Sequence, residues 1–151
     1  MSPLSQGREW YRSINLARLL VALVLASNLY AALAFFLTPR SFTAAYELMG
    51  TPGEAAVAGM GLLFLMWQVP YSLALLNPLK YQLSLLEALI MQTLGVLGET
   101  CILLRIPLQN AILRSSITRF LVFDVAGLAL LALAWLLVRS RKSEIERKNG
   151  I

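Results

Sequence analysis

The residues of this sequence best suited to chemistry are ionisable side chains inside long apolar stretches. They are Arg18, Glu87, Glu99, Arg119 and Asp124. An ionisable group within a bilayer costs about 2.5–3.5 kcal/mol on insertion scales, so each needs a partner or a function. The three acids among them, Glu87, Glu99 and Asp124, are candidates for binding a ligand or carrying a proton. We favour the structural alternative, in which polar groups hold helices together where lipid supplies no hydrophobic drive.

Depth along the predicted helices indicates which of these side chains are partners. Arg18 and Glu87 lie at similar distances from one membrane face, and Glu99 and Arg119 lie near the opposite helix ends. With a rise of about 1.5 Å per residue, the members of each pair fall within about one helical turn of the same level. We therefore predict two interhelical ion pairs, Arg18–Glu87 and Glu99–Arg119.

Further polar contacts are predicted deeper in the membrane. Asp124 lies near the level of Asn28 in the first span, so these two side chains are expected to meet. In the third span, Gln92 and Glu99 are seven residues apart and share one side of the helix, while Glu87 lies about 120° from Glu99. We expect this broad polar surface to face the bundle.

A candidate ligand-binding group surrounds Pro70 in the second span. Pro70 lacks the N–H that would bond to the carbonyl of Met66, which predicts a kink. A kinked helix with aromatic and amide side chains can form a pocket, although ordinary packing around a kink produces the same sequence, and we favour packing. The predicted ligand-binding residues are Trp67, Gln68, Tyr71, Glu87 and Gln92.

Several kinds of chemistry are excluded by composition. The chain has no histidine and one cysteine, Cys101, which excludes His-ligated metals, His general bases and a Cys-x-x-Cys pair within the chain. Glu87 and Glu99 lie about 18 Å apart along one helix, too far to act on one bond. We therefore expect no metal, no cofactor, no catalytic residues and no enzymatic activity.

The elements that position these residues are four apolar helices. Of 151 residues, 58% are hydrophobic and 14% charged, with a mean hydropathy of +0.69, whereas a soluble domain is about one-quarter charged. We predict an all-α integral membrane protein, a four-helix bundle forming a single membrane domain over 1–151. A small-x-small pattern at 32–34 resembles a signal cleavage site, but the apolar run continues past it, so a retained anchor is predicted. The spans are predicted at 13–37, 54–76, 81–104 and 116–138, followed by a basic tail at 139–151.

Turn residues mark the helix ends. Thr51 followed by Pro52 and Glu54 predicts an N-terminal cap on the second span, and Asn77 predicts a cap on the third. The short 77–80 connection makes the second and third spans antiparallel neighbours. The stretch 40–53 is expected to contain a short interfacial helix. Small residues expected to permit close helix approach are Ala55, Gly59, Gly95, Gly98 and Gly127.

Basic residues predict the orientation. With both termini cytoplasmic, the inner side carries Arg8, Arg12, Lys80, Arg139, Arg141, Lys142, Arg147 and Lys148, against Arg40, Arg105 and Arg114 outside. Eight basic residues on the inner side against three on the outer side favour a cytoplasmic location for both termini by the positive-inside rule. We expect a plasma (inner) membrane protein whose tail contacts anionic lipid headgroups rather than nucleic acid.

Two functions fit these features. The first is a non-enzymatic accessory or interaction subunit that associates with other membrane-protein subunits or as a homo-oligomer, as short loops and abundant small residues indicate. The alternative is a carrier or binding protein for a small lipophilic molecule, in one form proton-coupled through Glu87, Glu99 or Asp124.

Overall fold

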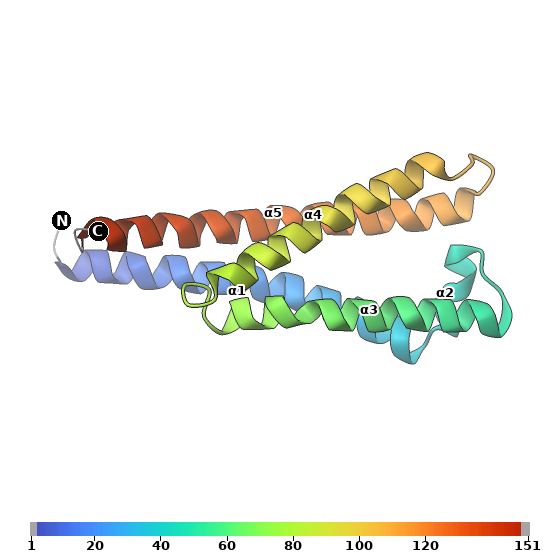
Figure 1. The fold of residues 1–151 in the computed structure, drawn as a ribbon, viewed down its shortest axis with the longest axis horizontal. Helices are drawn as coiled ribbons and strands as arrows, with labels where there is room; N and C mark the ends of the chain where they lie inside the picture. Colours follow the sequence, from blue (N-terminus) through green and yellow to red (C-terminus); the bar gives the residue numbers. More distant parts are fainter. Residues whose placement is uncertain (1–2, 149–151) are drawn as a thin grey trace.

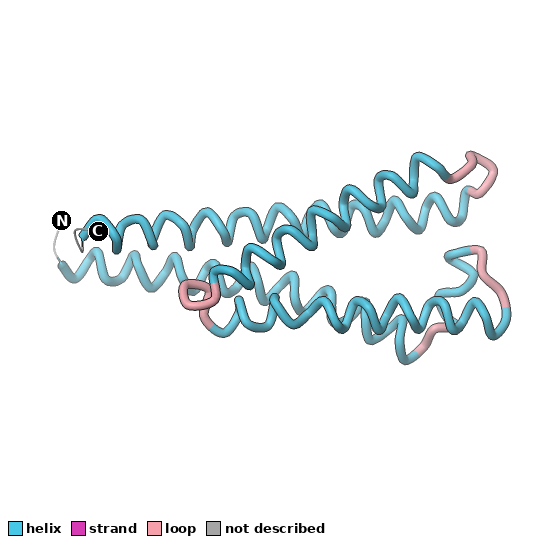
Figure 2. The backbone as a smooth tube through the Cα atoms, in the orientation of Figure 1, coloured by secondary structure: helices cyan, strands magenta, loops and turns pink. Residues whose placement is uncertain are grey.

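The computed structural model describes the backbone of residues 3–148 and the side chains of 11–141, 143 and 147. These residues are helical with short connections and contain no strand (Figure 2). The elements are α1 (Pro3–Leu37), α2 (Arg40–Thr43), the 3-10 helix η1 (Ala44–Tyr46), α3 (Gly50–Leu76), α4 (Gln82–Arg105) and α5 (Ala111–Lys148).

Four helices are long and apolar enough to cross a membrane, as predicted. The stretches that qualify are Tyr11–Leu37 in α1, Gly50–Leu76 in α3, Gln82–Arg105 in α4 and Ala111–Arg141 in α5. Each is at least as long as the roughly 20 residues that the hydrocarbon core requires. The predicted short helix between the first two spans is present as α2 and η1.

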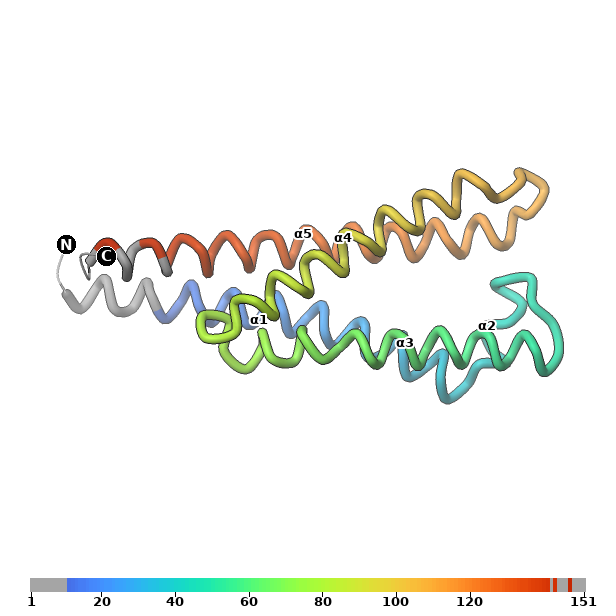
Figure 3. The backbone as a smooth tube through the Cα atoms, viewed as in Figure 1, coloured from blue at the N-terminus to red at the C-terminus, as the bar shows by residue number. Residues whose placement is uncertain are grey.

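The four long helices are arranged as two pairs joined at one end. Helix α1 packs along α3 and α4 packs along α5, while α1 also contacts α5 (Figure 1). Figure 3 shows that α3 and α4 meet at their short connection and diverge toward the opposite end. The two ends of the described chain lie together, beyond the α3–α4 connection (Figure 1).

The hydrophobic core lies in the half of the bundle nearest the chain ends. Small and branched side chains from all four long helices interlock there, which lets the helices approach closely. Its buried members are Ala17, Leu20, Val21, Val24, Leu25, Tyr71, Ala74, Leu85, Ala88, Leu131, Ala134 and Val138. The other half, where α3 and α4 diverge, contains two cavities of about 470 and 590 Å³.

The caps predicted for the second and third spans are not the ones that the structure shows. Helix α3 begins at Gly50, with Met49 as an N-cap that makes no side-chain hydrogen bond, so the predicted Thr51 cap is wrong. The first helical hydrogen bond runs from the Gly53 N–H to the Met49 carbonyl at 3.3 Å, and Gly50 takes a φ of +62° at the turn into the helix. At the next connection, Asn77 Oδ1 accepts from the N–H groups of Leu79 and Lys80 at 3.2 and 3.0 Å. Asn77 therefore caps the turn before α4, which begins at Gln82 with Tyr81 as its N-cap, so the predicted Asn77 cap on the helix is also wrong.

Helix α5 begins at Ala111 rather than at Ser116, because its N-terminus receives a cap from far along the chain. The Glu47 carboxylate accepts from Leu113 N–H at 3.3 Å and from Asn110 Nδ2 at 2.5 Å. Nearby, Arg114 Nη1 donates to the Leu103 and Ile106 carbonyls at 3.0 and 2.7 Å, which satisfies the end of α4. These contacts join η1, α4 and α5 at the open end.

The predicted basic tail is mostly a continuation of α5, which runs to Lys148. Arg141 Nη2 donates to Ser13 Oγ of α1 at 2.9 Å, so this extension lies along the start of α1. The side chains of Arg8, Lys142 and Lys148, which were counted for orientation, lie outside the described residues.

Glycines permit close helix approach at some predicted positions and not at others. A methyl group at Gly127 would lie 2.9 Å from Gln92 Nε2, and one at Gly95 would collide with the Asp124 carboxylate. Gly59 and Gly98 have open space at that position, so the prediction was wrong for them. The tightest backbone approach occurs instead at Gly61, where a methyl group would lie 2.6 Å from the Phe36 amide nitrogen.

Candidate ligand-binding site

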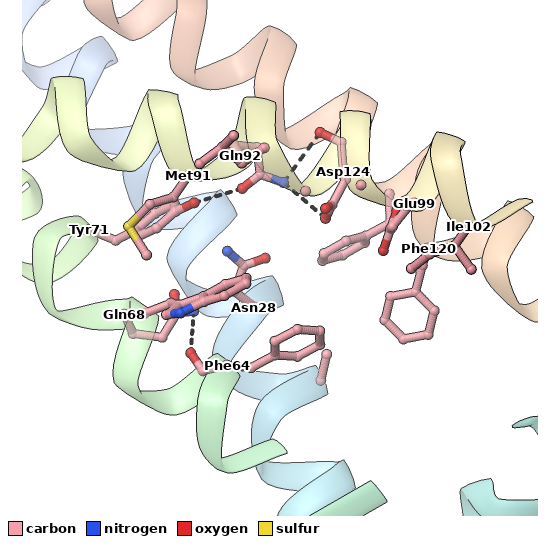
Figure 4. Close-up of a pocket in the computed structure, with 16 residues that line it drawn as sticks. Asn28, Phe64, Gln68, Tyr71, Met91, Gln92, Glu99, Ile102, Phe120 and Asp124 are labelled. Carbon is pink, nitrogen blue, oxygen red and sulfur yellow. Dashed lines mark hydrogen bonds between the residues drawn. The ribbon is translucent and has the colours of Figure 1, made fainter. Parts of the chain in front are cut away.

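A cavity of about 470 Å³ lies among α1, α3, α4 and α5 in the half where α3 and α4 diverge (Figure 4). Its size falls within the range of about 300–1,000 Å³ that is typical of small-molecule sites. The 16 lining residues are Asn28, Ala31, Phe64, Trp67, Gln68, Tyr71, Met91, Gln92, Leu94, Gly95, Gly98, Glu99, Ile102, Phe120, Phe123 and Asp124.

A hydrogen-bonded chain joins three helices along the cavity wall. Tyr71 Oη of α3 donates to Gln92 Oε1 of α4 at 2.8 Å, and Gln92 Nε2 donates to Asp124 Oδ1 of α5 at 3.0 Å (Figure 4). The same nitrogen lies 3.3 Å from the Asp124 carbonyl oxygen. Tyr71 and Gln92 are 3% and 4% exposed and Asp124 is half-buried, so the bond between Tyr71 and Gln92 is shielded from solvent.

Two buried acceptors on the wall receive no hydrogen bond from the described residues. Gln68 is 6% exposed; its Nε2 donates to the Phe64 carbonyl at 2.8 Å, and its Oε1 has no partner. The amide orientation is fixed because a carbonyl can only accept, so the unpaired atom must be the oxygen. Glu99 Oε2 is likewise buried without a partner. An unsatisfied buried polar atom costs about 1–3 kcal/mol, which a ligand donor can offset.

Aromatic rings form one side of the cavity. The Phe64 ring centroid lies 5.9 Å from that of Trp67 and 6.4 Å from that of Phe120. Outside the spans, Tyr46 in η1 extends the cluster, with its ring 6.3 Å from Phe120. Burial, followed by the negative charge of Glu99, raises the pKa of Tyr46 above its ordinary value, so this phenol stays protonated.

The cavity opens at the surface of the bundle between α3 and α4. Trp67 on α3 is 44% exposed, and Leu94 and Ile102 on α4 are 62% and 50% exposed, although all three line the cavity. Figure 4 shows the labelled side chains of the two helices facing one another across this gap. If the helices span a membrane, the opening faces lipid rather than water.

Most of the residues predicted to bind a ligand line this cavity. Trp67, Gln68, Tyr71 and Gln92 do so, and their role in binding stays a prediction. Glu87 does not line the cavity; it is exposed on another face of α4. The cavity also includes Asn28 and Asp124, the two side chains expected to meet, but the hydrogen bond of Asp124 is to Gln92 instead.

The two predicted ion pairs are not formed by the described side chains. Arg18 Nε donates to the Leu75 carbonyl at 3.1 Å, and Glu87 is exposed. Arg119 Nη2 donates to Ser116 Oγ at 3.1 Å, and Glu99 Oε2 is unpaired. Equal depth was an insufficient criterion, because it does not determine the direction in which each side chain leaves its helix.

Sequence reasoning missed several lining residues. Phe64, Met91, Phe120 and Phe123 carry no pattern that separates them from ordinary apolar helix residues. Glu99 could have been assigned to the site, because its spacing of seven residues from Gln92 places both on one side of α4.

Comparisons with known proteins assign no family to the chain. No protein-family model, no curated protein and no solved structure matches the chain.

Proposed function

We propose that this protein binds a small lipophilic molecule in the cavity between α3 and α4, as a binding or carrier protein. The observation that carries the proposal is the pair of unpaired buried acceptors, Gln68 Oε1 and Glu99 Oε2, in a largely apolar wall. A few polar groups in an apolar cavity are typical of small-molecule sites, where they orient the ligand.

The proposal is for binding without catalysis. Among the lining residues there is no serine, threonine, cysteine or histidine to serve as a nucleophile or a nitrogen base. The two lining acids, Glu99 and Asp124, are instead the candidates for proton coupling if the protein transports its ligand. Glu87, which was considered with them from the sequence, is outside the cavity.

We further propose that the bundle lies in a plasma (inner) membrane with both termini in the cytoplasm. The excess of basic residues near the chain ends supports this orientation. The cavity then occupies the outer half of the bundle, and its opening between α3 and α4 admits a ligand from the bilayer. Pro70 lies inside α3 beside Tyr71, and we propose that a kink there helps α3 diverge from α4.

The binding proposal is tested by filling the cavity. Gly98 lines it and has open space where a side chain would begin, so Gly98→Leu is expected to occupy the site without displacing a helix. The matched control is Gly59→Leu, which adds the same side chain in open space on α3 outside the cavity.

The measurement is native mass spectrometry of each protein extracted mildly from its own membrane. We expect a reproducible lipophilic mass, bound one to one, on the wild type and on Gly59→Leu, and its loss from Gly98→Leu. Lipid attached nonspecifically to the bundle would be retained by both variants. Equal retention by all three proteins, or no bound small molecule on any of them, would contradict the proposal.

A second candidate, the accessory or interaction subunit, is supported by the exposure of Glu87. This acid lies within the α4 span on a face that no other described helix covers. Because an acid facing lipid is unfavourable by about 2.5–3.5 kcal/mol on insertion scales, a partner helix with a donor or cation is a natural cover.

The subunit candidate predicts that Glu87→Leu releases a stoichiometric partner or dissociates a homo-oligomer. The readout is the mass of the complex after mild extraction, with Glu54→Leu as a control in α3 near the opposite end of the bundle. A monomeric wild-type protein without partners at native abundance would exclude this candidate and leave the binding proposal unaffected.

A further inference from the structure

The charged side chains on the wall of the α3–α4 cavity are all acidic. Glu99 and Asp124 belong to its 16 lining residues, which include no lysine or arginine. Arg119, although it is also on α5, lines a neighbouring cavity of about 590 Å³ between α1 and α5 and donates to Ser116. The two cavities share Ala31, Phe120 and Phe123 in their walls. The acids of the ligand cavity therefore have no basic partner on its wall.

The two carboxyl groups lie along one stretch of α4. A methyl group at Gly95 would collide with Asp124 Oδ2, so the Asp124 carboxyl rests against α4 at that residue. Glu99 follows Gly95 by four residues and therefore lies one turn further along the same helix face. Gln92 donates to Asp124 Oδ1, whereas Glu99 Oε2 receives no hydrogen bond.

The unsatisfied polar atoms of this wall require donors. In the part of the chain that the structure describes, the buried side-chain atoms without partners are Glu99 Oε2 and Gln68 Oε1, and both are acceptors. The Gln68 amide orientation is fixed by its bond to the Phe64 carbonyl. Gln68 is 6% exposed and lines the cavity (Figure 4). A ligand that offers only acceptors, such as a carboxylate, would leave Glu99 Oε2 and Gln68 Oε1 without donors. Its negative charge would also be repelled by these oxygen atoms.

Aromatic rings supply the remaining recognition chemistry. Phe64, Trp67 and Phe120 line the cavity, and rings of this kind attract a cation placed over their faces. We infer that the ligand is a lipophilic amine bound in its protonated form, with Glu99 as the counter-charge and Gln68 as an additional acceptor. This inference rests on the proposed binding function. It favours an ammonium with N–H donors over a quaternary ammonium, which has none.

The test compares probes that share one ring system and differ in charge. At neutral pH, 1-naphthylmethylamine carries an ammonium, 1-naphthylmethanol is neutral and 1-naphthoate is an anion. Each is titrated as a competitor of tritiated 1-naphthylmethylamine on the full-length protein in zwitterionic phosphatidylcholine nanodiscs. We expect the amine to bind at least about tenfold more tightly than the alcohol, because charge-assisted hydrogen bonds are the stronger ones, and the anion to bind least.

A matched pair of variants assigns the counter-charge. Glu99→Gln is expected to weaken amine binding by about tenfold or more while leaving alcohol binding within about twofold. Glu87→Gln makes the same change on the same helix outside the cavity and should leave both affinities unchanged. Unchanged alcohol binding by Glu99→Gln serves as the measure that the site remains folded.

Each other outcome counts against the amine. Equal affinity for amine and alcohol, or preference for the carboxylate, would overturn the inference while leaving a lipophile-binding protein. Amine selectivity that survives Glu99→Gln, or that is lost in Glu87→Gln, would overturn it as well. Binding of none of the probes also overturns the inference, and the comparison of Gly98→Leu with Gly59→Leu then decides separately whether the binding function stands.

Discussion

Replacing Gln92 with leucine is expected to lower the free energy of unfolding by about 2 kcal/mol. Gln92 is 4% exposed and accepts from Tyr71 of α3 while it donates to Asp124 of α5. Leucine matches its size approximately but removes these bonds, so no described side chain then donates to the Asp124 carboxyl, while the Tyr71 hydroxyl keeps the Ala88 carbonyl at 3.2 Å as an acceptor. Each unsatisfied buried group costs about 1–3 kcal/mol, and alternative partners in the unfolded membrane state reduce the total.

The measurement is reversible unfolding in mixed micelles with increasing denaturing detergent. Thr93→Val is the control on α4, since within the described residues the Thr93 hydroxyl bonds to the Leu89 carbonyl of its own helix and to no other helix, and it should shift stability by less than about 0.5 kcal/mol. Equal stability of Gln92→Leu and Thr93→Val would mean that the hydrogen-bonded chain does not hold the three helices together.

A double-mutant cycle isolates the bond between Tyr71 and Gln92. Tyr71→Phe removes the hydroxyl with little change in packing, and the two substitutions together remove both partners. Cycles of this kind in membrane helices average about 0.6 kcal/mol and reach about 1.7 kcal/mol. The 2.8 Å bond is almost fully buried, so we expect a coupling near the upper end of that range.

Features that depend on local sequence could be predicted here. The four helices long enough to span follow from apolar length, and the short connection at Asn77 follows from its turn residues, because each signal acts within a few residues of itself. The cap itself was predicted wrongly, since α4 begins at Gln82 after Tyr81. The cap on α5 could not be predicted in this way, since its acceptor, Glu47, is distant in the chain and lies in a non-glycine left-handed conformation with φ of 55°.

The candidate site was predicted only in part for a related reason. Trp67, Gln68, Tyr71 and Gln92 were selected by residue type, and they line one cavity. Glu87 was selected by depth alone. Whether a residue at a given depth faces the cavity or the exterior depends on how its helix is rotated about its own axis, and the uniformly apolar surroundings of a membrane helix give little indication of that rotation.

Replacing Gly61 with alanine is expected to destabilise the bundle by about 3 kcal/mol, at the upper end of the range for overpacked cores. The added methyl carbon would lie 2.6 Å from the Phe36 amide nitrogen and 2.8 Å from the Ala32 carbonyl oxygen. Both are backbone atoms of α1, so no side-chain rotation can relieve the contact, and α1 and α3 must separate. Their separation would also disturb Phe35, which is 3% exposed at the centre of the aromatic cluster.

Gly59→Ala provides the matched control, because it makes the same change on the same helix where there is open space. Alanine is favoured over glycine within a helix by about 0.5–1 kcal/mol, so this variant should be as stable as the wild type or more stable. Detergent unfolding should therefore shift in opposite directions for the two variants. A Gly61→Ala protein that unfolds together with Gly59→Ala would show that α1 and α3 are not in backbone contact at Gly61, and the packing described for this pair would have to be abandoned.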